Sequence, residues 1–232
     1  MKIKLDKKTK KVSCKTKEEW LSKRVIGGTT LSAIMGKSKW ATPNDVYNEL
    51  VLGKKKPVSD NERMATGRAN EDLLAKLFAN DFKNEYEVVN APKGKIWLFY
   101  RKDKPYITCT PDRLLINKTN GELEGLEIKD VEVLKKEDKE MWLNHNLPTN
   151  YLYQCIHYFI AFPNMKAVTL FPNLKFYTFK DNERVYEYSM HLRLTIYREE
   201  VEKLVEHCEK QIDDFWNNHI VKKVRPQRVI HL

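Results

Sequence analysis

The sequence has few cysteines, and none of them are paired in sequence. Its four cysteines, Cys14, Cys109, Cys155 and Cys208, are scattered along the chain. Because there is no C-x-x-C pair, neither a zinc ribbon nor a cysteine-ligated iron–sulfur cluster is expected. A disulfide framework is not expected in 232 residues with so few cysteines. A reducing compartment, the cytoplasm, fits better.

Long apolar runs are also missing. No run approaches the roughly 20 residues that a helix needs to cross a bilayer. The N-terminal segment MKIKLDKKTKKV is basic but lacks the apolar stretch of a signal peptide. We therefore expect a soluble, cytoplasmic protein.

Several catalytic motifs are absent from the sequence. There is no Walker loop, no G-x-G-x-x-G and no G-x-S-x-G segment. No motif therefore supports ATP use, dinucleotide binding or serine-hydrolase chemistry. His145 and His157 are isolated and form no H-E-x-x-H pattern. Zinc-peptidase chemistry is therefore unsupported.

Positive charge is abundant. The formal net charge is +10, which fits either a well-solvated surface or a polyanion partner, most often nucleic acid. Two basic segments fit backbone contacts to DNA, although solvated surface is an equal reading of each. They are the loop Lys54-Lys55-Lys56 and the tail Lys222-Lys223-Val224-Arg225.

The order of predicted elements indicates one α/β (α+β) domain over residues 1–232. This domain begins with a basic arm (about 1–16) and ends with a basic tail (about 220–232). Helical spacing and caps predict helices after the N-cap Thr16, over 29–35, from Pro43, and over 61–80, 150–162 and 190–219. Alternation and turn signals predict a meander of strands over 86–89, 96–101, 107–110, 114–117 and 123–129, with further strands over 167–170 and 175–179.

Two carboxylates and a lysine fall at hairpin spacing in the predicted sheet. Pro111 belongs at a strand start and places Asp112 there. A Thr-Asn-Gly turn separates Asp112 from Glu127-Ile128-Lys129. Residues two apart in a strand share a face, so Glu127 and Lys129 point the same way, within reach of Asp112. The alternative is an exposed hairpin that carries ordinary charged residues.

The residue types in this hairpin suit one chemistry. Two carboxylates and a backbone carbonyl form a hard oxygen site that favours Mg²⁺ or Mn²⁺. A neighbouring lysine can position or deprotonate a water, or stabilise a pentavalent phosphate. Metal-activated water with charge neutralisation is what phosphodiester hydrolysis requires.

Two helices offer further candidates. Gly67 and Glu71 lie four apart on one helix face, where Gly67 would allow close packing and Glu71 would be carried inward. An exposed glutamate is the alternative. Gln154 and Tyr158 are also four apart, in a helix rich in aromatic residues. A glutamine among aromatic residues suggests that its polar side chain has a function other than packing.

Taken in order, these motifs resemble a known nuclease family. The chain contains Gly67-x-x-x-Glu71, Pro111-Asp112, Glu127-x-Lys129 and Gln154-x-x-x-Tyr158. Its segment 26–40, IGGTTLSAIMGKSKW, is similar to the I-G-G-S-x-x-x-x-I-x-G-x-S opening of YqaJ-like proteins. Together they resemble the lambda-exonuclease and YqaJ-like viral recombinase nucleases, in the RecB-like branch of the PD-(D/E)xK superfamily. The resemblance runs over about residues 23–158.

The resemblance implies a role for each matching position. Asp112 and Glu127 would be metal ligands, and the Ile128 carbonyl would complete the shell. Lys129 would act on the water nucleophile. Glu71 would support metal binding, directly or through water.

The resemblance also implies phosphate contacts, a fold and partners. Gln154 would orient the nucleophile or a phosphate, and Arg24 and Thr29 would hold a DNA phosphate, such as the 5′ end. The implied fold is a restriction-endonuclease-like core, a mixed central sheet flanked by helices. Some relatives form ring-shaped trimers that degrade one strand of duplex DNA from 5′ to 3′, beside a single-strand annealing protein in phage recombination.

One position departs from the family pattern. The residue after E-x-K is usually small or uncharged, and here it is Asp130. On a regular strand its side chain points away from Glu127 and Lys129. If the strand ended at Lys129, Asp130 could instead turn towards the metals.

The leading hypothesis is a Mg²⁺-dependent exonuclease on linear duplex DNA ends. An endonuclease or nickase on the same scaffold is the second. A DNA-binding or assembly protein with a degenerate site is the third, and Asp130 is its only support. A CRISPR-adaptation nuclease of the same branch would hold an iron–sulfur cluster, which the scattered cysteines disfavour.

Overall fold

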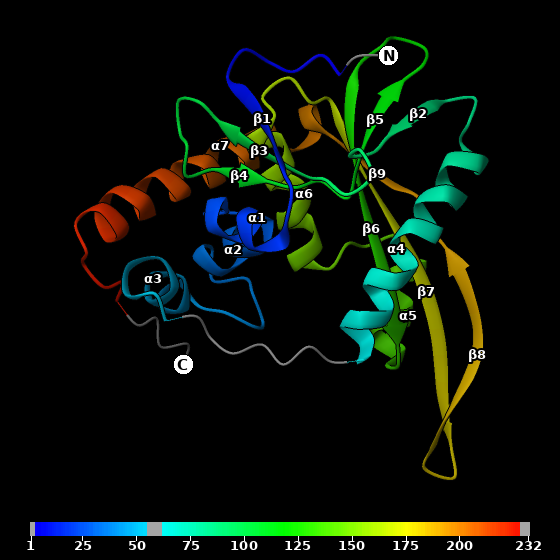
Figure 1. The fold of residues 1–232 in the computed structure, drawn as a ribbon. Coiled ribbons are helices and arrows are strands. Elements are labelled where there is room, and N and C mark those ends of the chain that lie inside the picture. Colours follow the sequence, from blue (N-terminus) through cyan, green and yellow to red (C-terminus); the bar gives the residue numbers. More distant parts are fainter. Residues whose placement is uncertain (1–2, 55–61, 228–232) are drawn as a thin grey trace.

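The strands form two sheets, with helices packed against them (Figure 1). The computed structural model describes residues 3–54 and 62–227, without the side chains of residues 62–64 and 68. The larger sheet has the order β2-β5-β6-β7-β8, with β9 paired to β7. Its β6–β7 pair is parallel and its other pairs are antiparallel, so this central sheet is mixed, as predicted.

The smaller sheet has the order β1-β3-β4 and is antiparallel. The strands are β1 (Thr9–Cys14), β2 (Tyr86–Val89), β3 (Ile96–Arg101), β4 (Thr108–Cys109), β5 (Arg113–Asn117), β6 (Leu123–Val133), β7 (Ala167–Lys180), β8 (Glu183–His191) and β9 (Leu194–Tyr197). The helices are α1 (Lys17–Lys23), α2 (Gly28–Ile34), α3 (Pro43–Leu52), α4 (Glu62–Asp81), α5 (Lys136–Leu143), α6 (Thr149–Ala161) and α7 (Arg198–Phe215), which continues into a π-helical segment, η1 (Trp216–Val221).

The local signals for helix starts are confirmed. The Thr16 side chain accepts a hydrogen bond from the Glu19 backbone N–H and caps α1. Pro43 begins α3, where its missing N–H costs nothing. These caps act through neighbouring residues, so the sequence alone could indicate them.

The predicted five-strand meander is wrong in its pairing. β2, β5 and β6 join the larger sheet, whereas β3 and β4 pair in the smaller one. The expected loose N-terminal arm contains β1, which pairs with β3 from Thr9 opposite Arg101 to Cys14 opposite Ile96. The side chains of Thr9 and Cys14 are buried, and the Thr9 hydroxyl donates to the Ala161 carbonyl at 3.1 Å. Tertiary contact therefore makes a strand of a lysine-rich segment that has little pattern of its own.

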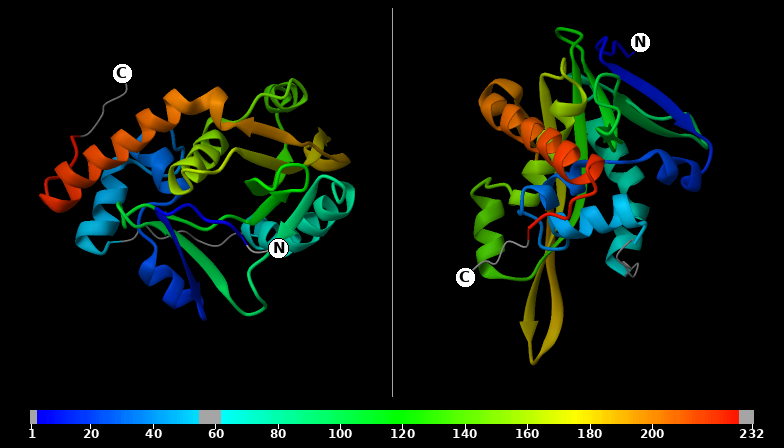
Figure 2. Two further views of the ribbon diagram at one scale, coloured as in Figure 1. Left: turned by 90° about the horizontal axis from the view of Figure 1, so that it is seen from above. Right: turned by 90° about the vertical axis from the view of Figure 1, so that its left-hand side faces the viewer.

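The predicted C-terminal helix over 190–219 is also wrong at its start. Residues up to His191 extend β8, and β9 pairs with β7 before α7 begins at Arg198. The two strands predicted over 167–170 and 175–179 are one long strand, β7. The β7–β8 hairpin extends beyond the rest of the molecule in two views (Figures 1 and 2). None of the described helices is long and apolar enough to cross a membrane.

The helix α6 lies in the main core. Eight of its thirteen residues are buried, from Tyr153 to Ala161 with Gln154 as the partly exposed exception. It contacts α2 on one side and α7 on another. A separate core, which includes Phe78, Leu126 and Phe171, joins α4 to the larger sheet. These cores hold α6, α4 and the β5–β6 hairpin around the site described next.

Candidate active site

The predicted β5–β6 hairpin is confirmed. Arg113 lies opposite Leu126, so the next residues outward, Asp112 and Glu127, face each other across the pair. The Asp112 carboxylate accepts a hydrogen bond from the Ile128 backbone N–H at 2.7 Å. Asp112 is thus held against the strand that carries Glu127, although 16 residues separate it from Ile128.

Glu127 and Lys129 share one face of β6, as predicted. The ammonium of Lys129 donates to the Glu127 carboxylate, and only 7% of the Glu127 side chain is exposed. The second carboxylate oxygen of Glu127 accepts from the hydroxyl of Tyr158, which arrives from α6. That same hydroxyl accepts from the Asp112 backbone N–H at 3.3 Å. Tyr158 therefore links the two acidic residues.

Burial and neighbouring charges shift the pKa values of Asp112 and Lys129. Burial and then the charge of Glu127 raise the pKa of Asp112 to about 8. Burial acts to lower the pKa of Lys129, but the charges of Glu127 and Asp112 outweigh it and raise that pKa above its ordinary value. Lys129 is therefore a protonated cation at neutral pH, which favours charge stabilisation over the role of base.

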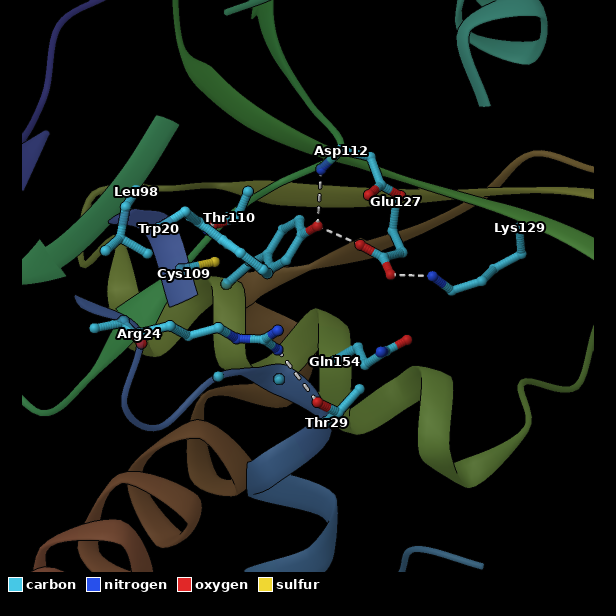
Figure 3. Close-up of a pocket in the computed structure, with 14 residues that line it drawn as sticks. Trp20, Arg24, Thr29, Leu98, Cys109, Thr110, Asp112, Glu127, Lys129 and Gln154 are labelled. Atoms are coloured by element: carbon cyan, nitrogen blue, oxygen red, sulfur yellow. Dashed lines mark hydrogen bonds and ion pairs between the residues drawn. The ribbon is translucent and has the colours of Figure 1, made fainter. Parts of the chain in front are cut away.

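A cavity of about 270 Å³ joins the hairpin to other predicted residues (Figure 3). Asp112, Glu127 and Lys129 lie along one side of it, and Arg24 and Thr29 along another. An Arg24 guanidinium N–H donates to the Thr29 hydroxyl at 3.3 Å. Within residues 3–54 and 62–227, no carboxylate forms an ion pair with Arg24, although the charge of Glu49 acts on it from further away, and Arg24 lines the cavity.

Gln154 also lines this cavity, between the Arg24 side and Lys129 (Figure 3). Its amide oxygen is buried and has no hydrogen-bond partner in the described part of the chain. A buried polar atom without a partner costs free energy unless something else binds it. The buried, unpartnered oxygen is consistent with the prediction that the polar side chain of Gln154 has a function.

Glu71 lies further from the centre than predicted. Its carboxylate accepts from Arg113 at 2.7 Å, and Arg113 also donates to the Asp112 backbone carbonyl. Glu71 does not line the cavity with Glu127 and Lys129, but its charge helps to raise the pKa of Asp112. The close packing expected at Gly67 is wrong, because a Cβ there would meet open space.

Asp130 turns away from the site. The strand β6 continues to Val133, so Asp130 lies on the opposite face from Lys129. Its carboxylate accepts from Asn70 and from Asn173, each at 2.8 Å, and pairs with Lys175 at 2.8 Å. These partners satisfy its charge, so it neither approaches nor repels a group in the cavity.

Sequence reasoning did not assign roles to Tyr158 and Arg113. Tyr158 stood in the Q-x-x-x-Y motif, and its spacing from Gln154 was a signal that it faces the same site. Arg113 carried no such signal, because its partner Glu71 is 42 residues away. His157 is a buried core histidine whose ring contacts the Thr108 carbonyl at 2.8 Å. Within the described residues, no three His, Cys, Asp or Glu side chains form a ready metal shell.

The DNA-contact segments are only partly described. Lys54 follows α3, and Lys55 and Lys56 lie outside the described residues. Near the other end, the Lys223 carbonyl accepts from the Tyr47 hydroxyl at 2.8 Å, and Arg225 lies over the Tyr47 ring. Residues 228–232 of the tail lie outside the description.

The fold matches that of a known class of nuclease. An alkaline exonuclease from Laribacter hongkongensis aligns over 88% of this chain and 93% of its own, with a TM-score of 0.52 and 14% identity. Its complex with dAMP aligns over 90% and 96%, with a TM-score of 0.53 and 13% identity. At this identity the likeness establishes the mixed α/β fold.

The family is identified from the sequence match. The model of the YqaJ-like viral recombinase domain matches residues 19–161, more than half of the chain, and the chain belongs to this family. The uncharacterised protein YqaJ of Bacillus subtilis (strain 168) is 28% identical over 149 residues, which are 62% of this chain and 41% of that protein. The chain thus spans less than half of that relative. The predicted family is confirmed, and every predicted site residue lies within the matched range.

Proposed function

We propose that this chain is a Mg²⁺-dependent exonuclease that degrades linear duplex DNA from its ends, 5′→3′, in phage-type recombination. The observation that carries the proposal is one cavity that is lined by Asp112, Glu127 and Lys129 and also by the cation Arg24. Acidic ligands suit a metal, and an arginine suits a phosphate. The family's description as a viral recombinase domain and the alkaline-exonuclease fold support the same activity.

The residues at the hairpin fit a divalent metal. Their donors are hard carboxylate oxygens, and the mutual repulsion of Asp112 and Glu127 is a cost that a cation would relieve. Asp112, Glu127 and the Ile128 carbonyl would hold Mg²⁺, with Mn²⁺ as a substitute, and Glu71 would support them through Arg113. When bound, the ion supplies an activated water and neutralises charge on the phosphate.

The remaining residues of the site bind and orient the DNA strand and the attacking water. Lys129, kept protonated by its neighbours, stabilises negative charge that develops on the scissile phosphate. Gln154 orients the attacking water, which donates to its free amide oxygen, or a phosphate, which accepts from its amide NH₂ group. Arg24 and Thr29 hold the terminal phosphate of the strand. Tyr158 fixes the Glu127 carboxylate by donating to it.

Other parts of the proposal rest on the family resemblance. They are a ring-shaped homotrimer, a single-strand annealing partner, and action in the cytoplasm of a host cell. An endonuclease on the same scaffold remains the alternative activity. The alternative of a degenerate site has lost its one support, since Asp130 is satisfied by Asn70, Asn173 and Lys175.

The test compares linear and circular duplex DNA, with 5′-phosphate and 5′-hydroxyl ends, in Mg²⁺ and in EDTA. We expect linear DNA to be degraded in Mg²⁺ and not in EDTA, faster from 5′-phosphate ends because Arg24 contacts that phosphate. Gel electrophoresis of time points measures this. Cutting of covalently closed circles would overturn the exonuclease in favour of the endonuclease.

A further inference from the structure

A second cavity, of about 480 Å³, adjoins the first. The two share Thr110 and Asp112, so Asp112 stands at the boundary between them. The second cavity lies where the two sheets meet, with Trp97 of β3 on one wall and Glu71 and Asp72 of α4 on another. The roles proposed above do not use this space.

The acidic wall of the second cavity is partly neutralised, because one arginine pairs with its two carboxylates. The Arg113 guanidinium pairs with Glu71 at 2.7 Å and also with Asp72. On the other side, Lys93 and Lys95 line the cavity, and neither has a carboxylate at ion-pair distance among the described residues. Apart from Asp112, three cations (Lys93, Lys95 and Arg113) and two carboxylates (Glu71 and Asp72) line this cavity, so the balance of charge is positive on the lysine side.

A tight turn presents the two lysines. The Lys95 backbone N–H donates to the Pro92 carbonyl at 2.9 Å. Gly94 occupies the left-handed region at φ 71°, which other residues adopt at a cost. Lys93 and Lys95 therefore project from a constrained loop, which lowers the entropy lost when they bind an anion.

Trp97 provides an aromatic wall beside these lysines. Its ring is partly exposed and packs edge-on against Phe99, with a centroid separation of 6.0 Å. The ammonium of Lys11 lies 4.3 Å from the ring centroid. Sites for single-stranded nucleic acid combine cations that follow the backbone with aromatic rings that contact the bases.

We infer that the second cavity binds the scissile DNA strand on the far side of the cut from Arg24. This inference rests on the proposed function. A strand whose terminal phosphate lies at Arg24 passes Asp112 and then enters this cavity. There its phosphates contact Lys93 and Lys95, and a base lies against Trp97. The ligand class is an unpaired DNA segment.

The test measures nucleotide binding in a Lys129→Ala background and in EDTA, so that cleavage does not interfere. The probes are thymidine 5′-monophosphate, which fills only the first cavity, and the trinucleotide pTpTpT, which reaches the second. We expect Lys93→Ala/Lys95→Ala, and separately Trp97→Ala, to raise the Kd of pTpTpT about tenfold without changing that of the mononucleotide. The lysine variant should also lower the salt dependence of log Kd by about 0.7 per lysine.

The matched control is Lys203→Ala/Lys210→Ala, which removes the same charge from α7. It should leave both affinities unchanged, and melting temperatures of all variants verify folding. If the lysine variant and its control bind pTpTpT equally, while the native chain cuts linear DNA, the inference fails and the proposed function stands. If the native chain neither cuts DNA nor binds either probe, both fail.

Discussion

At the scale of the residue, Asp112 and Glu127 are each restrained by a donor from another part of the chain. Asp112 is bound by the Ile128 backbone N–H, and Glu127 by Lys129 and the Tyr158 hydroxyl. These donors offset only part of the cost of burial, since the pKa of Asp112 is still raised to about 8. The hydrogen bonds thus keep the acidic residues in a geometry that suits a cation.

Lys129→Ala should lower the rate of DNA cleavage by roughly 10²–10³-fold, because it removes the cation that stabilises charge on the phosphate. Binding to linear duplex DNA should persist, since Arg24 and the basic surface remain. Single-turnover cleavage and a gel-shift assay measure the two effects. Lys175→Ala is the matched control, because that lysine pairs with Asp130 on the other face of β6. Cleavage at the native rate by Lys129→Ala would refute its role.

Tyr158→Phe should lower the free energy of unfolding by about 1–3 kcal/mol, because a buried oxygen of Glu127 loses its donor. It should also raise the Mg²⁺ concentration needed for half-maximal cleavage, since Glu127 would be held less firmly. Urea unfolding and a Mg²⁺ titration measure these changes. Tyr153→Phe, on the same buried helix, should leave the Mg²⁺ requirement unchanged. Equal requirements in the two variants would contradict the role of Tyr158.

At the scale of the element, the site depends on how closely α6 packs on β6. A Cβ added at Gly125 would lie 2.7 Å from a ring carbon of Tyr158, so only glycine allows this approach. The close contact lets the Tyr158 hydroxyl reach Glu127 two residues further along the strand.

Gly125→Ala should lower the free energy of unfolding by about 1–3 kcal/mol, since the added methyl group overlaps Tyr158. Cleavage should fall as well, because the tyrosine must move. Gly67→Ala on α4 is the opposite case: a Cβ there meets open space, and the helix should gain up to about 1 kcal/mol. Urea unfolding measures both. A Gly125→Ala protein as stable as the native chain would mean that α6 can shift freely.

Element prediction succeeded where the signal was local. The alternation over β2 and β3 and the caps of α1 and α3 are properties of neighbouring residues. It failed where distant contacts decide. The segment Leu194–Tyr197 is a strand because β7 offers it an edge, with Leu170 opposite Leu194. From the helical spacing of its apolar residues alone, the last helix was predicted to start at residue 190, which wrongly included this strand.

At the scale of the whole molecule, a buried histidine couples stability to pH. Burial lowers the pKa of His157 to about 4, and the ring stays neutral against the Thr108 carbonyl. Below pH 6.5, the ordinary pKa of histidine, His157 binds a proton in the unfolded chain but stays neutral in the folded chain. The stabilisation is therefore complete above that value and is lost as pH falls towards 4. Asp112, whose pKa is raised, acts in the opposite direction.

Comparison with His157→Gln isolates the histidine, because Asp112 is the same in both proteins. Between pH 6.5 and 4, the native chain should lose stability relative to the variant by about 1.4 kcal/mol per pH unit. Urea unfolding at several pH values measures this difference. A difference that does not change with pH would mean that His157 has the same pKa in the folded and the unfolded chain.

The sequence by itself determined the acidic hairpin, the helix caps and the family. Each depends on spacing along the chain or on the order of motifs, and none of the three needs knowledge of distant contacts. Only the tertiary structure decided that β1, β3 and β4 form a separate sheet, that Tyr158 binds Glu127, and that Arg113 neutralises Glu71. These partners lie tens of residues apart, and their meeting depends on how the buried faces of α6, α4 and the sheets fit together.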